Sequence, residues 1–387
     1  MTHPERLVER MRGFGTTVFA EMSALAVATD SINLGQGFPD TDGPAELLEG
    51  AVDAIRGGHN QYPPGIGVPA LRQAVAEHQQ RLYGLGYDPD SEVLVTAGAT
   101  EAIAASVIAF AGPGDEVVLF EPYYDSYAAC VALGGATRRT VTLERTGDSW
   151  GFDPAALERA VTTRTKVLVL NSPHNPTGTV FGPAELALIA EIAIRNDLIV
   201  VSDEVYEHLI FDGRAHVPIA TLPGMRERTV TISSAGKTFS VTGWKIGWAG
   251  APAPLLAAVR TVKQFLTYVN GAPFQPAVAA ALATAEKVAP AAALQHQRDL
   301  LCDGLTRLGF DVVRPQATYF ATVDVGSDAV GFCRELPRRA RVVAIPSSVF
   351  YDSSAGDGYV RFAFCKRPAL LEQALARLAG AGYGSGS

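Results

Sequence analysis

The chain has 387 residues, of which 48% are hydrophobic and 19% charged, and its formal net charge at pH 7 is −8. This composition predicts a well-buried globular protein with one large domain or two. The negative charge and the lack of a basic run argue against nucleic-acid binding. No uninterrupted apolar stretch is long enough to span a bilayer, so we expect no membrane partner either.

The N-terminus and the cysteines indicate the compartment. Residues 1–14 are charged and lack the apolar core of a signal peptide. The four cysteines are scattered without a CxxC pair, which is typical of reduced thiols. The seven histidines show no paired ligand spacing. We therefore expect a cytoplasmic protein without a metal site.

The first ninety residues predict helices separated by two glycine-containing loops. Residues 1–31 are expected to form an N-terminal arm that packs with a small C-terminal domain. The loop at residues 34–40 contains Gly35 and Gly37, which permit a close approach to a ligand. Helices are predicted at residues 44–56 and 69–82, and the loop between them carries Tyr62.

From about residue 91, short apolar strands alternate with helices. Strands are predicted at 92–96, 117–120, 166–170, 198–201 and 229–232, with helices at 102–111 and 183–195. This alternation predicts an α/β fold with a largely parallel, doubly wound sheet in a large domain, residues 32–271. The chain then becomes alanine-rich, and strands at 318–323, 341–345 and 359–364 precede a helix at 368–378. We interpret residues 272–387 as a smaller α+β domain.

Six polar residues lie just beyond predicted strands, where open α/β sheets bind ligands. They are Thr100, Tyr124, Asn175, Asp203, Tyr206 and Lys237. Lys237 follows four small residues, in a crowded turn that favours a free amine able to form a Schiff base. Taken alone, Lys237 is better interpreted as an ordinary surface lysine than as a catalytic one. Because all six residues share this position at strand ends, a functional role is favoured for the whole set.

The same residue types suit a heteroaromatic cofactor. Asp203 can keep a pyridine nitrogen protonated, although an aspartate there also suits a helix N-cap. Tyr206 and Asn175 can donate hydrogen bonds to a phenolate oxygen, and Asn175 also suits a turn before proline. The ring of Tyr124 could stack on the cofactor ring, or it could be an aromatic side chain of the core. The turn at residues 98–101, between the strand 92–96 and the helix 102–111, is a natural phosphate cradle, although many such turns bind nothing. Ser234 and Lys245 flank the turn of Lys237 and could hold an anion as well.

Several motifs together resemble one family. NSPHNPTG at 171–178, SDEVY at 202–206, SSAGKTFSVTGWKIGW at 233–248 and YVRF at 359–362 resemble class I/II aminotransferases of fold type I. LGQGFPD at 34–40 and NQYPPGIG at 60–67 look like the subgroup of kynurenine, glutamine and methionine aminotransferases and N-succinyldiaminopimelate aminotransferase-like proteins. The resemblance covers nearly the whole chain. It implies pyridoxal 5′-phosphate as the cofactor.

The resemblance also implies roles for individual residues. Lys237 looks like the Schiff-base lysine and proton shuttle, Asp203 like the partner of the pyridine nitrogen, and Asn175 and Tyr206 like ligands of the ring oxygen. The implied phosphate ligands are Ala99, Thr100, Ser234 and Lys245, joined by Tyr62 from the neighbouring subunit of a homodimer with shared active sites. Related enzymes often have arginine where this chain has Lys245. Gly37, Asn175 and Arg361 would bind the substrate, Arg361 gripping its α-carboxylate.

The implied activity is transfer of an amino group between an L-amino acid and a 2-oxo acid. A cysteine-S-conjugate β-lyase would use the same Lys237, and a non-catalytic binder on this scaffold is a third possibility. Residues 264–274 are rich in apolar and aromatic side chains, and no motif assigns a second arginine to a distal carboxylate. We therefore expect a large neutral or aromatic substrate, or N-succinyldiaminopimelate.

Overall fold

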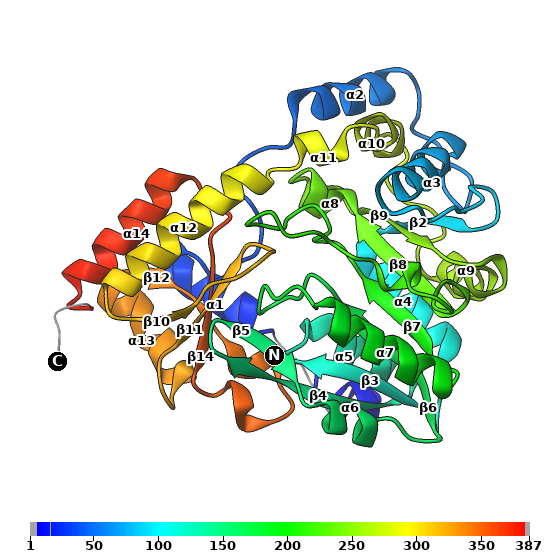
Figure 1. The fold of residues 1–387 in the computed structure, drawn as a ribbon. Coiled ribbons are helices and arrows are strands. Elements are labelled where there is room, and N and C mark those ends of the chain that lie inside the picture. Colours follow the sequence, from blue (N-terminus) through cyan, green and yellow to red (C-terminus); the bar gives the residue numbers. More distant parts are fainter. Residues whose placement is uncertain (1–5, 16, 384–387) are drawn as a thin grey trace.

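The computed structural model describes residues 6–15 and 17–383, and its largest element is an eight-stranded sheet (Figure 1). The strand order is β2-β9-β8-β7-β6-β3-β4-β5. The strands are β2 Val93–Ala97, β3 Glu116–Glu121, β4 Thr137–Thr146, β5 Ser149–Phe152, β6 Thr165–Asn171, β7 Ile199–Asp203, β8 Thr229–Ser234 and β9 Ile246–Gly250. Only the pairings of β9 with β2 and β8, and of β5 with β4, are antiparallel. The sheet is therefore largely parallel, as predicted.

Both faces of this sheet are covered, which explains why its central strands are apolar throughout. In β3, Val117 and Leu119 join the core under one layer of helices, whereas Val118 and Phe120 face the other layer. The first layer contains α4 Gly98–Phe110, α5 Asp125–Gly134 and α9 Ala253–Leu266. The second contains α6 Pro154–Ala160 and α7 Pro183–Arg195.

A third group of helices packs beside β2 and β9. It consists of α2 Ala45–Arg56, α3 Pro69–Tyr83 and α10 Phe274–Leu282, which share a core with Val93 and Trp248. The helix α10 begins after residue 271, where we expect the large domain to end, yet it packs on α2 and α3. The short helix α11 Ala285–Val288 follows it. The domain limits themselves stay a prediction.

The C-terminal part forms a separate antiparallel sheet with the order β10-β11-β14-β13. Its strands are β10 Asp311–Val313, β11 Phe320–Asp324, β13 Ile345–Pro346 and β14 Tyr359–Ala363. The helices here are α12 Ala291–Arg307, α13 Ala329–Ala340 and α14 Pro368–Gly380. Figure 1 shows α12 and α14 side by side in the yellow-to-red part of the chain. This arrangement matches the expected smaller α+β unit.

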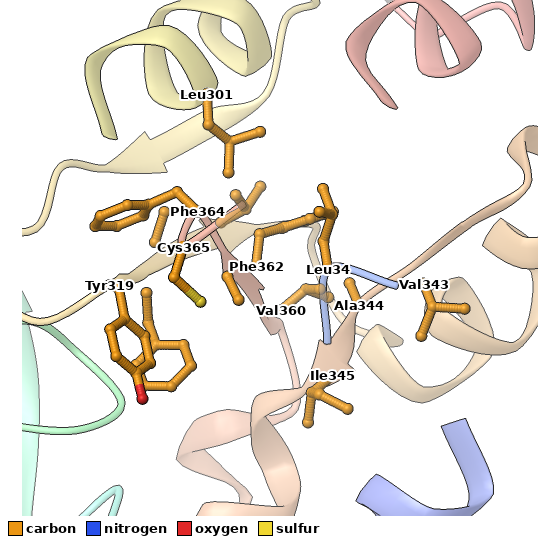
Figure 2. Close-up of a cluster of buried hydrophobic side chains, with 14 of the residues drawn as sticks. Leu34, Leu301, Tyr319, Val343, Ala344, Ile345, Val360, Phe362, Phe364 and Cys365 are labelled. Atoms are coloured by element: carbon orange, nitrogen blue, oxygen red, sulfur yellow. The ribbon is translucent and has the colours of Figure 1, made fainter. Parts of the chain in front are cut away.

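The N-terminal segment packs on the small sheet. It comprises a 3₁₀ turn at Glu9–Met11, α1 Val18–Ala28 and β1 Ile32–Asn33, and β1 pairs in parallel with β12 Val342–Val343. Leu34 is fully buried, and Figure 2 shows it among the side chains of Ala344 and Val360. Residues 1–5 and 16 of the expected arm lie outside the described residues. Anchoring Leu34 fixes where the following loop, with Gly35 and Gly37, must run.

Within residues 6–15 and 17–383, no single helix is long and apolar enough to cross a bilayer. One bent pair, Phe274–Leu282 with Ala285–Arg307, meets the length and composition limits together at an angle of 77°. Its first helix, α10, is part of the core beside β2 described above.

Candidate active site

A cavity of about 410 Å³ opens where the large sheet, the small sheet and the N-terminal segment meet. Eleven of the twelve residues singled out in the sequence line it. They are Gly37, Ala99, Thr100, Tyr124, Asn175, Asp203, Tyr206, Ser234, Lys237, Lys245 and Arg361. The exception is Tyr62. The cavity therefore brings together residues from strand ends that are far apart in the sequence.

Lys237 lies in α8 Ala235–Thr238, a single helical turn directly after β8. Its Nζ is 2.5 Å from the hydroxyl oxygen of Tyr319. Burial is the main cause that lowers the pKa of this amine, to about 8, while Asp203 acts in the opposite direction. A larger fraction of Lys237 is therefore neutral and nucleophilic at physiological pH than of an ordinary lysine.

Asp203 ends β7 and is 4% exposed. It accepts a hydrogen bond of 2.5 Å from the Tyr127 hydroxyl and a weaker one from the backbone N–H of Val205. Burial raises its pKa to about 6. Among the described residues, no lysine or arginine forms an ion pair with this carboxylate. A buried, unpaired carboxylate suits a cationic ring nitrogen as its partner.

The N-terminus of α4 forms an anion cradle at another wall of the cavity. Gly98, Ala99 and Thr100 form its first turn and line the cavity, and the backbone N–H groups of a first turn are those that helices offer to phosphates. Gly98 has φ +71°, and a side chain there would meet Lys245 Nζ at 3.2 Å. The ammonium group of Lys245 thus lies against the backbone of the cradle. These groups fit a phosphate.

Arg361 in β14 is 2% exposed and forms no ion pair within the described part of the chain. Its Nη1 donates to Asn175 Oδ1 at 3.1 Å, and its Nη2 donates to the carbonyl of Gly35 at 3.2 Å. The guanidinium carbon lies 3.9 Å from the centre of the Phe320 ring, while Nε is buried without a partner. Burial lowers the pKa of Arg361 to about 10. A buried cation with neutral partners and an unused donor fits a carboxylate ligand.

Asn175 and Tyr206 are held by neighbours that share the same cavity. The backbone N–H of Asn175 donates to Asn171 Oδ1 at 2.7 Å, and Asn171 in turn donates to the carbonyl of Asp203. The ring of Tyr206 packs edge-on against Tyr319, with 5.3 Å between ring centres. Burial raises the pKa of the Tyr206 phenol, so this side chain stays a hydrogen-bond donor.

Tyr124 and Gly37 form two further walls. The ring of Tyr124 packs edge-on against Tyr127 at 5.7 Å, and burial raises the pKa of its phenol to about 12. At Gly37, a Cβ atom would lie 2.3 Å from the Phe320 ring. Only glycine fits there without moving the ring that packs on Arg361.

Sequence reasoning missed Tyr319, Tyr127, Asn171 and Phe19. Tyr319 bridges the site, because its hydroxyl contacts Lys237 and donates to the carbonyl of Gly37 at 2.6 Å. Nothing in the surrounding ATYFATVD pattern marks it as more than a core aromatic. Asn171 opens the NSPHNPTG motif and Tyr127 lies three residues after Tyr124, so both carried a usable signal.

Tyr62 lies outside this cavity. It is 81% exposed, and its ring packs edge-on against Tyr268 at 5.8 Å. With residues 60, 61 and 63 it lines a second hollow, whose other wall is formed by residues 269–272. Its expected role in a neighbouring subunit stays a prediction.

Comparison with known proteins assigns the chain to a family. The model for "Aminotransferase class I and II" matches residues 29–378. A probable N-succinyldiaminopimelate aminotransferase of Mycobacterium tuberculosis is 54% identical, with 96% of this chain and 97% of the relative covered. The methionine aminotransferase of Escherichia coli is 40% identical, with coverage of 94% and 95%, and the mouse kynurenine–oxoglutarate transaminase 3 is 36% identical, with coverage of 95% and 88%.

The three-dimensional comparison agrees with the sequence comparison. The solved structure of the M. tuberculosis N-succinyldiaminopimelate aminotransferase superposes with a TM-score of 0.94 at 53% identity, covering 97% of this chain and 100% of that one. This confirms the predicted fold type I architecture and, with it, the dependence on pyridoxal phosphate. The chain therefore belongs to the class I and II aminotransferase family.

Proposed function

We propose that this pyridoxal-phosphate-dependent aminotransferase attaches its cofactor to Lys237 and holds the ring nitrogen with Asp203. The observation that carries the proposal is the pair of buried, oppositely charged groups that line one cavity without pairing with each other. Asn175 and Tyr206 would bind the ring oxygen, and Tyr124 would cover a ring face. Bound pyridoxal phosphate supplies an aldehyde that takes up the amino group and a ring that withdraws electrons from the substrate α-carbon.

The assignment of Lys237 has a direct test. Borohydride reduction of the purified, cofactor-loaded protein, followed by peptide mass mapping, should find the cofactor mass on the peptide that contains Lys237. Lys245 provides an internal comparison, because it lines the same cavity. A cofactor mass on Lys245, or no modified peptide at saturating cofactor, would overturn the assignment.

The remaining residues would orient the substrate and move protons. Arg361 and Asn175, with the backbone at Gly37, would hold the α-carboxylate, which turns the α-hydrogen toward Nζ of Lys237. The amine of Lys237, once free of the cofactor, would accept the substrate α-proton as a general base and would later give a proton back. The lowered pKa of Lys237 supports this role, because a base is effective when its pKa lies near the working pH. Ala99, Thr100, Ser234 and Lys245 would bind the phosphate.

We propose a substrate whose side chain is large and mostly neutral or aromatic. Arg361 is the one arginine among the described residues that line the cavity, where apolar side chains come from Phe19, Ile103 and Phe320. N-succinyldiaminopimelate is the second candidate, supported by the name of the M. tuberculosis relative. Assaying the purified protein against a panel of amino donors with several 2-oxo acids separates the two. Exclusive use of aspartate would contradict both.

We further propose a homodimer with shared active sites. Tyr62 lines the second hollow and is 81% exposed. Phe265, in the last turn of α9, is 83% exposed, and Tyr268, whose ring packs on Tyr62, is 50% exposed. Such exposed rings suit an interface. Mixing an inactive Tyr62 variant with an inactive Lys237 variant should form hybrids with one intact site and restore part of the activity. A fully active monomer at assay concentration would refute this.

The β-lyase alternative gains no support from the relatives that the comparisons identify. It would differ from transamination by releasing pyruvate and ammonia from a cysteine conjugate without any 2-oxo acid. Measuring pyruvate with and without an acceptor therefore distinguishes the two activities on the same Lys237.

A further inference from the structure

A cluster of two histidines and a glutamate lies outside the cavity, between α3 and the segment after β7. His78, Glu207 and His208 each bring one potential ligand atom to within 4.8 Å of the other two. The Nε2 atoms of the two histidines are 2.8 Å apart. His78 is fully buried, Glu207 is 4% exposed and His208 is half-buried. We call these three residues the His–Glu–His cluster.

Two buried carboxylates lie in or beside the cluster, and their hydrogen-bond partners are hydroxyl groups and a histidine. Both oxygens of Glu207 accept hydrogen bonds from hydroxyl groups, from Tyr83 at 2.7 Å and from Ser233 at 2.5 Å. A second buried carboxylate, Glu204, contacts His216 at 2.7 Å. Neither glutamate pairs with a lysine or arginine within residues 6–15 and 17–383. Buried carboxylates are normally paired or bound to a metal.

The hydrogen bonding of the histidines is incomplete as well. The Nδ1 atoms of His78 and His216 are buried and have no hydrogen-bond partner. Two buried ring nitrogens beside the two carboxylates therefore lack a partner within the described part of the chain. A divalent cation bound at Glu207 would supply this carboxylate with the positive partner that no lysine or arginine of residues 6–15 and 17–383 provides.

We propose that His78, Glu207 and His208 bind a divalent transition-metal ion, with Zn²⁺ as the best fit. Two imidazoles and one carboxylate, with water in a fourth position, form a donor set that Zn²⁺ commonly takes. Zinc–nitrogen bonds of about 2.0–2.1 Å in tetrahedral geometry place two nitrogens ~3.3 Å apart. The imidazoles, now 2.8 Å apart, need to separate by about 0.5 Å for the ion to replace the hydrogen between them.

The surroundings suit such an ion. Tyr83 and Ser233 already hold the oxygens of Glu207, the kind of outer contact that orients a metal-bound carboxylate. His208 is only half-buried and gives the ion a route from solvent.

The ion would act on stability and positioning, because none of its three ligands lines the cavity. Glu207 directly follows Tyr206, and Ser233, which binds Glu207, directly precedes Ser234. The cluster therefore lies next in the chain to two residues that line the cavity. Metal binding would link α3 to the segment after β7 that contains Tyr206 and Glu207.

The test uses tag-free, cofactor-loaded protein that is dialysed against a chelator and freed of unbound cofactor. Calorimetric titration with Zn²⁺, followed by elemental analysis of the washed protein, should find one ion per chain. Thermal unfolding should occur at a higher temperature with Zn²⁺ present. His208→Gln should weaken binding at least tenfold, whereas His59→Gln, at an exposed histidine, should leave it unchanged.

Three results would overturn the proposal. They are no binding at a hundredfold excess of Zn²⁺, equal binding by wild type and His208→Gln, or an equal loss in His59→Gln. If His208→Gln does not fold, Co²⁺ added to the wild-type protein decides the question by difference absorption. Intense visible bands of four-coordinate cobalt support the site, and the weak spectrum of six-coordinate cobalt refutes it.

Discussion

Replacing Arg361 with lysine tests the substrate side of the cavity. The guanidinium is buried, stacks on Phe320 at 3.9 Å and contacts only neutral partners, Asn175 and the carbonyl of Gly35. Lysine retains one positive charge but loses the planar fork that binds a carboxylate through two parallel hydrogen bonds. Arg361→Lys should therefore weaken amino-acid binding and slow the first half-reaction, with little change in cofactor binding.

The magnitude follows from the contacts that the fork makes. Losing one charge-assisted hydrogen bond to the substrate costs about 1.5–3 kcal/mol. This corresponds to a loss of ~10–150-fold in kcat/KM. The lost contact with the Phe320 ring adds ~0.5–2 kcal/mol, expressed partly as reduced protein stability. The loss in kcat/KM should therefore exceed what the change in the unfolding temperature explains.

Stopped-flow absorbance of the first half-reaction measures the effect, because it isolates the amino-acid step. Arg145→Lys is the matched control: Arg145 pairs with Asp311 at 2.6 Å and does not line the cavity. That variant should transaminate at the wild-type rate. If Arg361→Lys kept its amino-acid affinity while the protein lost much of its thermal stability, the residue would be a structural cation and the reasoning would be wrong.

Three further predictions concern the other end of the cavity. Cofactor-free protein should take up pyridoxal phosphate on Lys237 with a rate that rises with pH and levels off above about 8, since only the neutral amine reacts; a midpoint near 10.5 would contradict the lowered pKa. Asp203→Ala should still bind the cofactor but lose activity by about 10²–10³-fold in steady-state assays, and near-native kcat would exclude the electrostatic role. Tyr319→Phe should lower kcat about tenfold with little change in KM, because it frees Lys237 Nζ; a change in KM alone would place Tyr319 on the substrate instead.

Much of the large sheet follows from local sequence pattern. The strands predicted at residues 117–120 and 166–170 lie within β3 and β6. They are apolar on both faces because helices cover both faces of the sheet. The strand β9, Ile246–Gly250, was not predicted. It consists of IGWAG, where small residues dilute the apolar signal. Gly247 is required there because a Cβ atom would lie 2.5 Å from the carbonyl carbon of Gly98.

The site was predictable where a residue lies at a strand end or within a motif. Lys237, Asp203 and Asn175 were identified in this way, because parallel strands bring their carboxyl ends to one edge. Tyr319 was not, since its role depends on a contact between the residue before β11 and Lys237 in α8, which local pattern does not encode. The His–Glu–His cluster escaped for the same reason: His78 and His208 are separated by 130 residues and meet only in the folded chain.

The charged groups of the cavity share a feature that links fold to function. Asp203 is held by a tyrosine hydroxyl, Lys237 by another hydroxyl, and Arg361 by an amide and a carbonyl. Burying these groups without ion pairs costs folding free energy, because neutral hydrogen-bond partners compensate a charge only in part. The same arrangement leaves each charge free for a ligand of opposite sign or for covalent attachment. The family's cofactor and substrate carry the matching groups, so binding recovers what folding the empty cavity costs.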